Sequence, residues 1–284
     1  MRRATTPKST NIQINTEIGE DVAIIIILLW LSSLIGLLAI DLSSAPLLWI
    51  VAAVWLRSFL HTGLFITTHE AIHGVINTQD RKVNDFIGSI TSWLYALLPY
   101  KILVKNHQLH HRFPASEQDP DFHKLGQSNF LLWYGNFMKE YLSGRQAWIL
   151  LIGMTVIFCT FLSLHIAISN IFLFWVIPIL ISSLQLFTFG IFLPHRNPNR
   201  KQRDYASRTA RGDMPERLAL CDRHKATSSN YSVFWSFIAC YHFDYHWEHH
   251  QYPHLPWYSL PIARQQAFCH QTIKSKQNIS RTKT

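Results

Sequence analysis

Charged side chains are scarce in this chain of 284 residues. Asp, Glu, Lys and Arg make up 15% of the sequence, against about 25% in a typical soluble domain. The four cysteines include no Cys-x-x-Cys pair, which excludes a disulfide-rich scaffold. Aromatic residues reach 13%, which excludes an intrinsically disordered chain. Hydrophobic residues, at 48%, do not separate soluble from membrane proteins, so their distribution along the chain must decide.

Two long runs of the sequence contain no Asp, Glu, Lys or Arg. The first covers 19 residues from Val22 to Ile40, and the second covers 47 residues from Trp148 to Pro194. A helix needs about 20 apolar residues to cross a bilayer, so both runs are predicted to span a membrane. The first run starts too far from the N-terminus for a signal peptide and lacks a small-residue cleavage site. We therefore expect it to be retained as a span.

The apolar segments predict four membrane crossings. A polar turn at residues 41–46 follows the first span, and a second span runs from Leu47 towards Thr68. The 47-residue run is long enough for two crossings, with a break at residues 165–170. The stretch from Phe86 to Leu98 is too short to cross and is expected at the membrane interface. The predicted fold class is therefore an all-α integral membrane protein with four transmembrane helices.

Lysine and arginine predict how these spans are oriented. Fourteen of them follow Pro194, eight lie between Thr67 and Ala147, and three precede Thr10. The two short turns near residues 41 and 165 contain none. By the positive-inside rule, both termini and the long middle segment are expected in the cytoplasm.

The net charge of +9 is concentrated in the basic stretch from Arg196 to Lys225 and in the tail after Gln271. No recognised nucleic-acid motif accompanies it, so we expect anionic lipid headgroups, and not nucleic acid, as the partner of these stretches. A single membrane domain is expected over residues 21–265. It would lie between a flexible cytoplasmic N-terminus, 1–20, and a basic polar tail, 266–284.

Histidine is abundant, with sixteen residues, and many of them fall into three short motifs. Each motif repeats histidine at offsets of three or four residues, which places the imidazoles on one face of a helix. Neutral imidazole is the commonest metal-binding side chain. So many of them predict two metal ions, because one ion seldom needs more than six ligands. The motifs are His69-x-x-x-His73, His107-x-x-His110-His111 and His242-x-x-x-His246-x-x-His249-His250.

Three other interpretations of these histidines stay open. They could form a solvated or pH-sensitive surface, although two His-x-x-His-His motifs are improbable by chance. Residues 69–73 also spell His-Glu-x-x-His, the zinc metalloprotease pattern, in which the glutamate is the general base. An intramembrane protease needs one further ligand, which leaves both His-x-x-His-His motifs unexplained. A metal transporter would place its ligands at mid-membrane depth, whereas these motifs follow the ends of spans.

The motifs and their order relative to the spans resemble those of the membrane di-iron desaturase and hydroxylase superfamily. Within it, four segments are similar to the bacterial-type β-carotene ketolases, a resemblance that covers roughly residues 20–265. Three positions depart from that family. Glu70 replaces the usual Asp, Ile72 the usual Met or Cys, and Asp244 the usual Gly or Glu. These departures leave the histidines intact. The similar segments are Phe65–Gly74, Asp119–His123, Phe189–Arg196 and Tyr241–Trp257.

The resemblance implies a non-haem di-iron oxygenase that acts on the β-ionone rings of β-carotene. It would use O₂ and electrons from a ferredoxin-type donor to hydroxylate carbon 4 twice, and the gem-diol would lose water to give the ketone (echinenone, canthaxanthin). A carotenoid hydroxylase or a lipid or fatty acid desaturase with the same site is the nearest alternative. The expected iron ligands are His69, His73, His107, His110, His111, His246, His249 and His250, with His195 and His242 as further candidates.

Carboxylates near the motifs complete the predicted site. Asp119 and Asp121 are the candidate catalytic residues. We expect both aspartates, and also Glu70 and Glu248, to hold a ligand imidazole or to pair with an arginine. This role is favoured over direct catalysis.

The remaining histidines are expected outside the metal site, except that two interpretations of His61 stay open, a metal ligand or a satisfied histidine of the interior. His61 and Arg57 interrupt the second span, and ionisable side chains within a span are expected to face the protein interior or a cavity. His165 falls in the turn at the opposite side and is expected to be structural. Four others are expected to be ordinary surface residues: His123, His224, His254 and His270.

Overall fold

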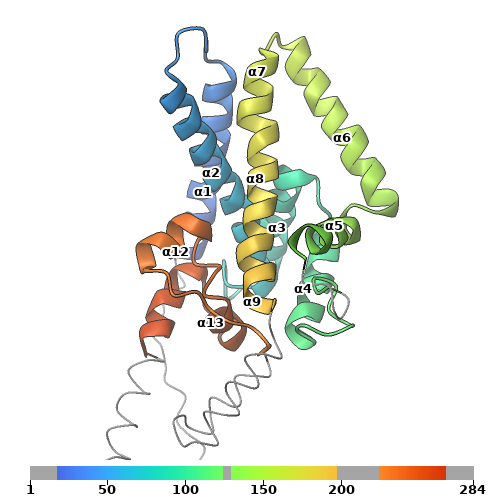
Figure 1. Ribbon diagram of the computed structural model, residues 1–284, viewed down its shortest axis with the longest axis vertical. Helices are drawn as coiled ribbons and strands as arrows, with labels where there is room; N and C mark the ends of the chain where they lie inside the picture. Colours follow the sequence, from blue (N-terminus) through green and yellow to red (C-terminus); the bar gives the residue numbers. More distant parts are fainter. Residues whose placement is uncertain (1–17, 124–128, 197–223, 267–284) are drawn as a thin grey trace, which may run out of the picture.

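The computed structural model describes residues 18–123, 129–196 and 224–266. Within these ranges every regular element is a helix, and no strand is present. Long helices fill one half of the molecule, and shorter helices gather at its other end (Figure 1). The structure therefore confirms the predicted all-α fold.

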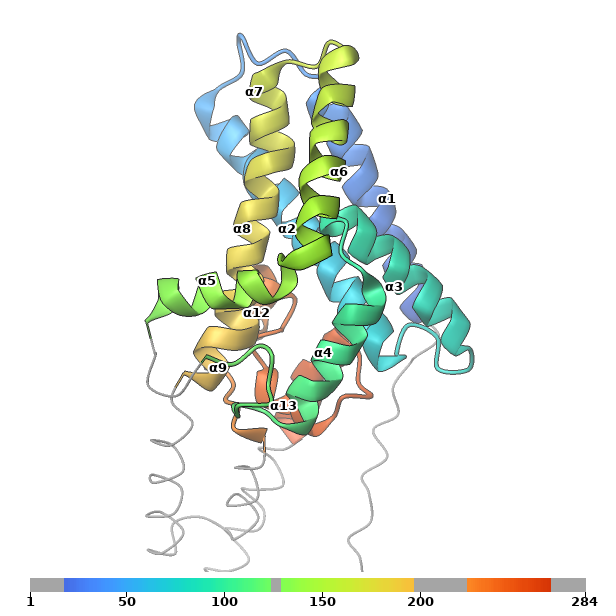
Figure 2. The same cartoon turned by 90° about the vertical axis from the view of Figure 1, so that its right-hand side faces the viewer.

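Four helical segments are long and apolar enough to cross a membrane. They are α1 (Gly19–Leu38), α2 (Leu47–His73), α6 (Gly144–Ser163) and a fourth segment, Ile168–His195. The turns from α1 to α2 and from α6 to the fourth segment lie at the same end of the molecule (Figures 1 and 2). The prediction of four crossings is confirmed, and the chain is a multi-pass membrane protein. The fourth segment consists of α7 (Ile168–Ile171), η2 (Phe172–Val176), α8 (Ile177–Leu186), η3 (Phe187–Phe192) and α9 (Leu193–His195).

Helix α2 continues beyond the apolar run that predicted it. The helix ends at His73, because Gly74 takes the left-handed conformation at φ 74° and its N–H bonds back to the Ala71 carbonyl at 3.1 Å. Glycine adopts this conformation without a steric penalty. The extra turn carries His69 and His73 out of the apolar part of the bundle.

A sharply bent helix pair follows α2. Helix α3 (Arg81–Ala96) begins where the Asp80 side chain accepts the N–H of Lys82 at 2.8 Å, and α4 (Tyr100–Arg112) departs from it at 100°. At 16 residues, α3 is too short to cross a bilayer alone. The bend brings α4 beneath the ends of the long helices (Figure 2).

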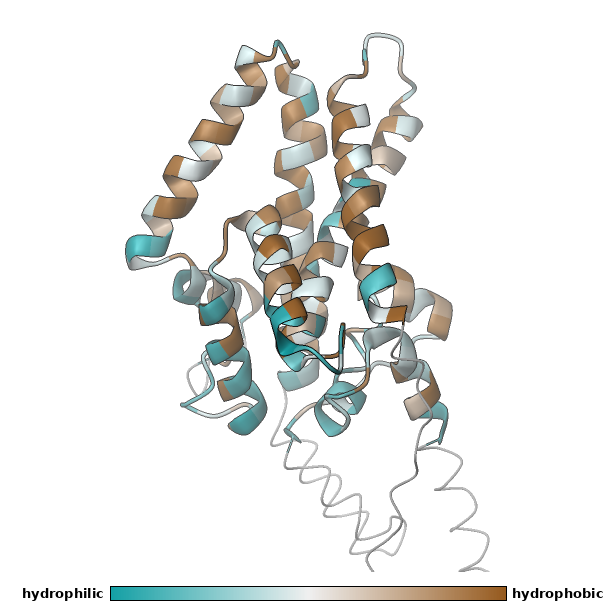
Figure 3. Ribbon diagram, turned by 180° about the vertical axis from the view of Figure 1, so that it is seen from behind, coloured by the Kyte–Doolittle hydropathy of each residue, from teal (hydrophilic) through white to brown (hydrophobic). Residues whose placement is uncertain are grey.

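Polar and apolar residues separate along the long axis of the molecule. Apolar residues dominate the long helices, and hydrophilic residues gather at the end formed by the short ones (Figure 3). The short helices besides α4 are α5 (Phe130–Tyr141), α12 (Val233–Cys240), α13 (His246–Gln251) and η5 (Trp257–Ser259).

An arginine inside a span joins three of the long segments. Arg57 of α2 is fully buried, as is His61, so the prediction that both face the interior is confirmed. Its guanidinium donates to the Trp30 carbonyl of α1 at 2.9 Å and to the Phe174 carbonyl of η2 at 3.1 Å, and lies 5.3 Å from the centre of the Trp30 ring. Backbone carbonyls and an aromatic face thus take the place of water around the charge.

Helix α6 stands apart from the other spans. None of its residues is buried, and it leans away from the fourth segment (Figure 1). Its first half is fixed to the α3–α4 bend, where Gln146 donates to the Leu97 carbonyl at 2.9 Å. The divergence leaves an opening between α6 and the fourth segment.

Close packing of α3 on its neighbours depends on a glycine, which makes a matched pair of substitutions informative. A Cβ on Gly88 would lie 2.3 Å from the Tyr100 ring and 2.8 Å from Ala71 Cβ, whereas a Cβ on Gly36 of α1 would meet nothing within 4 Å. We expect Gly88→Ala to destabilise the protein by about 1–3 kcal/mol through overpacking. Gly36→Ala should be neutral or stabilising by up to about 1 kcal/mol, since Ala favours the helix. Thermal unfolding in detergent measures both, and equal melting temperatures for the two variants would contradict this packing.

Candidate metal centre

The histidine motifs of distant segments meet at the polar end of the bundle. The last turn of α2 and the helices α4, α9 and α13 converge there (Figures 1 and 2). Their ring nitrogens form two groups, and within each group the atoms lie within 4.8 Å of one another. The first nitrogen group comprises His69, His73, His107, His111 and His249, and the second nitrogen group comprises His110, His195, His246 and His250.

The two His-x-x-His-His motifs divide their histidines between these groups in opposite ways. In α4, the i, i+4 pair His107 and His111 enters the first nitrogen group, and the remaining histidine enters the second. In α13, the i, i+4 pair His246 and His250 enters the second group, and the remaining histidine enters the first. Each helix therefore supplies both groups, so a tilt of either helix moves nitrogens of both.

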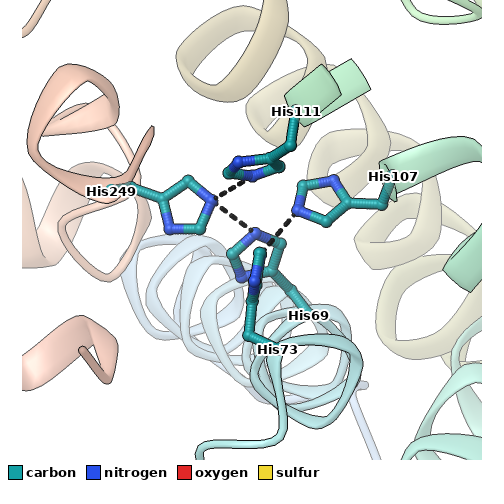
Figure 4. A group of neighbouring side chains, drawn as sticks. All are labelled: His69, His73, His107, His111 and His249. Carbon is teal, nitrogen blue, oxygen red and sulfur yellow. Dashed lines mark hydrogen bonds between the residues drawn. The ribbon is translucent and has the colours of Figure 1, made fainter. Parts of the chain in front are cut away.

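Facing imidazoles approach each other nitrogen to nitrogen. Five Nε2–Nε2 distances lie between 2.7 and 3.2 Å, three in the first group and two in the second. Figure 4 shows the rings of the first group directed at one another from three helices. Two nitrogens bonded at about 2.1 Å to one metal ion, at right angles, lie about 3.0 Å apart. The nitrogen spacing therefore fits the ligands of one ion in each group.

Two rings of the second nitrogen group are oriented by contacts to Nδ1, the ring nitrogen that faces away from the group. His195 Nδ1 donates to the Lys225 carbonyl at 2.9 Å, because a carbonyl only accepts. Its Nε2 then carries a lone pair, and this atom is buried without a hydrogen-bond partner among the described residues. His110 Nδ1 likewise lies 3.0 Å from Asp119 Oδ2. A bond on the outer nitrogen that fixes ring and tautomer is typical of metal-binding histidines.

The protonation of these histidines also suits metal binding. Burial, followed by the charges of neighbouring histidines, lowers the pKa of most ring nitrogens outside the spans, which leaves the lone pair that a metal ion needs. His110 differs, because Asp119 outweighs the effect of burial and raises its pKa. The histidines whose pKa is lowered well below 6.5 are His107, His111, His246, His249 and His250.

Asp119 and Asp121, the candidate catalytic carboxylates, lie beside the second nitrogen group. Asp119 accepts the backbone N–H groups of Ala115 at 2.8 Å and of Asp121 at 2.9 Å. Burial raises the pKa of Asp119, but the charge and hydrogen bond of His110 more than offset this and hold it below its usual range. Burial outweighs the attraction of His110 at Asp121 and raises its pKa to about 6. An oxygen of each carboxylate lies within 4.8 Å of a His110 ring nitrogen.

Glu70 and Glu248 contact the C-terminal segment. Glu70 Oε1 lies 3.6 Å from His69 Nδ1, and Oε2 accepts the Trp257 N–H at 3.1 Å. Glu248 accepts from Arg264 at 3.0 Å. Glu70 thus occupies the position of the general base in the metalloprotease pattern. Its carboxylate, however, accepts the backbone N–H of Trp257 and lies beside Nδ1 of His69. The geometry does not favour the protease interpretation.

His242 does not join either nitrogen group. The prediction of one helix from His242 to His250 is wrong, because Tyr241 and His242 take left-handed φ values of 50° and 59° and α13 begins only at His246. The break turns the ring away, and His242 Nδ1 lies 2.9 Å from Ser236 Oγ. The other further candidate, His195, lies inside the second group.

The remaining histidines are distributed differently from the sequence-based expectation. His123 and His224 are 9% and 7% exposed, so the prediction that they are surface residues is wrong. The His123 ring packs on Trp133 at 4.3 Å, and His224 Nε2 lies 3.1 Å from a side-chain oxygen of α13. His254 is exposed as predicted, and His270 lies outside the described residues.

An apolar cavity of about 560 Å³ leads from the membrane side to both nitrogen groups. At one end it is lined by Leu151 of α6 and Leu180 of α8, which are 59% and 56% exposed, so it opens between these helices. At the other end it reaches histidines of both groups, namely His69, His107, His110 and His246.

Sequence reasoning missed three residues that shape the inner end of this cavity. Phe243 lies between the two groups, with its ring 4.8 Å from His69 and 5.5 Å from His246. Gly190 makes room for it, since a Cβ there would lie 2.3 Å from the Phe243 ring. Tyr141 also lines the cavity. The one available sequence signal was Gly190, which lies five residues before His195 at the end of the last span.

Replacing His195 and His242 separately tests which histidines hold metal. His195→Ala should lower the metal content from about two ions per chain to about one, because it removes one of four nitrogens of the second group. His242→Ala should retain about two ions, because the ring faces Ser236. Metal analysis of the purified variants measures both. Equal metal loss in the two variants would contradict the division into two groups.

Comparisons with known proteins identify the family of this chain. The fatty acid desaturase family model matches residues 43–272. A β-carotene 4-ketolase of Protosiphon botryoides is 37% identical over 77% of this chain and 52% of its own length. A zeaxanthin 4-ketolase of Chlamydomonas reinhardtii is 33% identical over 84% of this chain and 49% of its own. The chain thus spans about half the length of these two relatives.

The chain covers most of the length of a shorter relative. The β-carotene ketolase of Paracoccus sp. (strain PC1) is 34% identical over 79% of this chain and 83% of its own length. No solved structure matches the chain. From the family match and this coverage, the chain belongs to the fatty acid desaturase family, and within it to the family of the β-carotene ketolases.

Proposed function

We propose that the chain is a di-iron oxygenase that oxidises carbon 4 of the β-ionone ring of β-carotene to a ketone. The observation that carries this proposal is the apolar cavity, which meets both nitrogen groups at one end and lipid at the other. Its volume of about 560 Å³ lies within the range of about 300–1,000 Å³ that ligand pockets occupy. β-Carotene is a hydrocarbon that dissolves in lipid, so one ring can enter from the side while the rest stays in the bilayer.

The two nitrogen groups are the proposed iron ligands. Five imidazoles would hold one ion and four the other, while Asp119 and Asp121 lie beside His110 of the second group. Bound there, the two irons would supply the electrons and the O₂ activation needed to oxidise an unactivated C–H bond, chemistry that no side chain performs. The protein's own contribution is to fix the imidazoles and to position the ring.

Individual side chains support these tasks. Asp119 orients His110, and the Lys225 carbonyl orients His195, so both rings present Nε2 inwards. Phe243 packs between His69 and His246 and closes the cavity beneath the substrate ring. The apolar wall excludes water from the reacting carbon. We therefore assign positioning roles to Asp119 and Phe243.

Two rounds of oxidation at the same carbon give the ketone. Each round uses one O₂, two electrons and two protons, places one oxygen on carbon 4 and releases one water. The second round produces a gem-diol, which loses water to form the carbonyl. The ring must therefore stay in the cavity, or return to it, between the rounds.

The electrons are proposed to come from a ferredoxin-type donor on the cytoplasmic side. The helices α4, α9 and α13, which carry most of the nitrogen groups, lie at the end opposite the two short turns that lack lysine and arginine (Figure 1). By the positive-inside rule, this arrangement supports a cytoplasmic metal centre and cytoplasmic termini, within a proposed single membrane domain over residues 21–265.

Pigment analysis tests the proposed reaction. In bacterial cells that accumulate β-carotene, the wild-type chain should yield pigments that gain one oxygen and lose two hydrogens per modified ring, as mass spectrometry measures. His110→Ala should abolish this product, because His110 belongs to the second nitrogen group and approaches His250 at 3.1 Å. A gain of oxygen alone would indicate a hydroxylase. Unchanged β-carotene beside well-expressed, iron-loaded protein would indicate a lipid substrate.

A further inference from the structure

The inner end of the cavity carries a polar pair that a hydrocarbon does not need. Asp121 and Tyr141 both line the cavity wall. The Tyr141 hydroxyl donates to Asp121 Oδ1 at 2.6 Å, and an oxygen of Asp121 lies within 4.8 Å of a His110 ring nitrogen. The pair therefore stands beside the second nitrogen group, where the reacting carbon must lie.

Other polar side chains on the wall lie elsewhere and bond to their own surroundings. Thr155 donates to the Leu151 carbonyl within α6 at 2.7 Å. Ser183 of α8 bonds the Tyr134 hydroxyl at 2.7 Å, and Tyr95 accepts from a serine of α8. Among the described residues that line the cavity, Asp121 is the one carboxylate.

A buried carboxylate is unfavourable unless polar partners surround it. Asp121 is 5% exposed and forms one side of an apolar cavity. β-Carotene offers it no hydrogen-bonding group, whereas the product of the first oxidation carries a hydroxyl on carbon 4. The polar pair thus matches the intermediate and not the starting substrate.

We propose that Asp121 and Tyr141 bind the carbon 4 hydroxyl of the once-oxidised ring and retain it for the second oxidation. The carboxylate accepts the hydrogen of that hydroxyl, and the Tyr141 hydroxyl orients the carboxylate by donating to Asp121 Oδ1. No bond is made or broken by the pair. Its effect is to slow release of the alcohol, so that the product is a ketone. This inference rests on the proposed function.

The ratio of alcohol to ketone in the pigment tests this role. In the β-carotene-accumulating cells, Tyr141→Phe and Asp121→Asn should raise the share of 4-hydroxy pigment among oxidised products about tenfold, the effect of one charge-assisted hydrogen bond. Tyr134→Phe is the matched control, since its hydroxyl lies on the same helix but bonds Ser183 at 2.7 Å, and it should keep the wild-type ratio. Wild-type ratios in both Tyr141→Phe and Asp121→Asn would overturn the inference.

A second measurement separates retention from a structural role, because Asp121 also links α5 to the loop at Asp119. With purified, iron-loaded enzyme, Tyr141→Phe should raise KM for 4-hydroxy-β-carotene about tenfold more than it raises KM for β-carotene. An equal rise for both substrates would reduce the pair to a structural contact and overturn the inference. If the wild-type chain forms no 4-oxygenated pigment at all, the proposed function itself fails. A wild-type ketone with unaltered variants rejects this inference alone.

Discussion

Close approach of neutral imidazole nitrogens at the polar end of the bundle is the constraint on which the rest of the structure depends. Nitrogen lone pairs about 3 Å apart are mutually repulsive unless a proton or a cation lies between them. Burial works against the proton by lowering the pKa of His107, His111, His246, His249 and His250. A cation in each nitrogen group would satisfy the geometry and the protonation together. In the proposed function, the metal ions would hold the helix ends of α2, α4, α9 and α13 together in addition to apolar packing.

The two sides of the membrane-spanning part are packed differently. Arg57 joins α1, α2 and the fourth segment through carbonyls, which gives one side of the bundle a fixed core. Helix α6 has no buried residue, and the apolar cavity opens between α6 and α8. In the proposed function, the fixed core near α2 would keep the imidazoles in place, and the opening beside α6 would admit the substrate ring.

Much of this architecture follows from local sequence patterns. Apolar runs of membrane-spanning length predicted the four crossings, because a charge is costly in lipid, and Arg57 is the one charged residue inside them. The three- and four-residue spacing of histidines predicted metal ligands on helix faces. The division of each His-x-x-His-His motif between two groups was not predictable, since it depends on how α4 and α13 face one another. The left-handed backbone at His242, where the ring stays outside both nitrogen groups, was not predictable from the histidine spacing either.

The cavity could not be predicted from the sequence, because it also depends on tertiary packing. Its walls come from the fourth segment and from α2, α3, α4, α5, α6 and α13. Its entrance depends on the tilt of α6, which the sequence pattern does not determine. Phe243 and Gly190 meet only after the chain has folded, although they lie 53 residues apart in the sequence. Burial of His123 also depends on α5, where Trp133 covers its ring.

X-ray absorption spectroscopy combined with metal analysis of the purified wild-type chain tests the central claim most directly. The account predicts about two irons per chain, each surrounded mainly by imidazole nitrogens, with a second iron detectable in the outer scattering. A single zinc ion per chain, or iron ligated mainly by carboxylate oxygens, would contradict it.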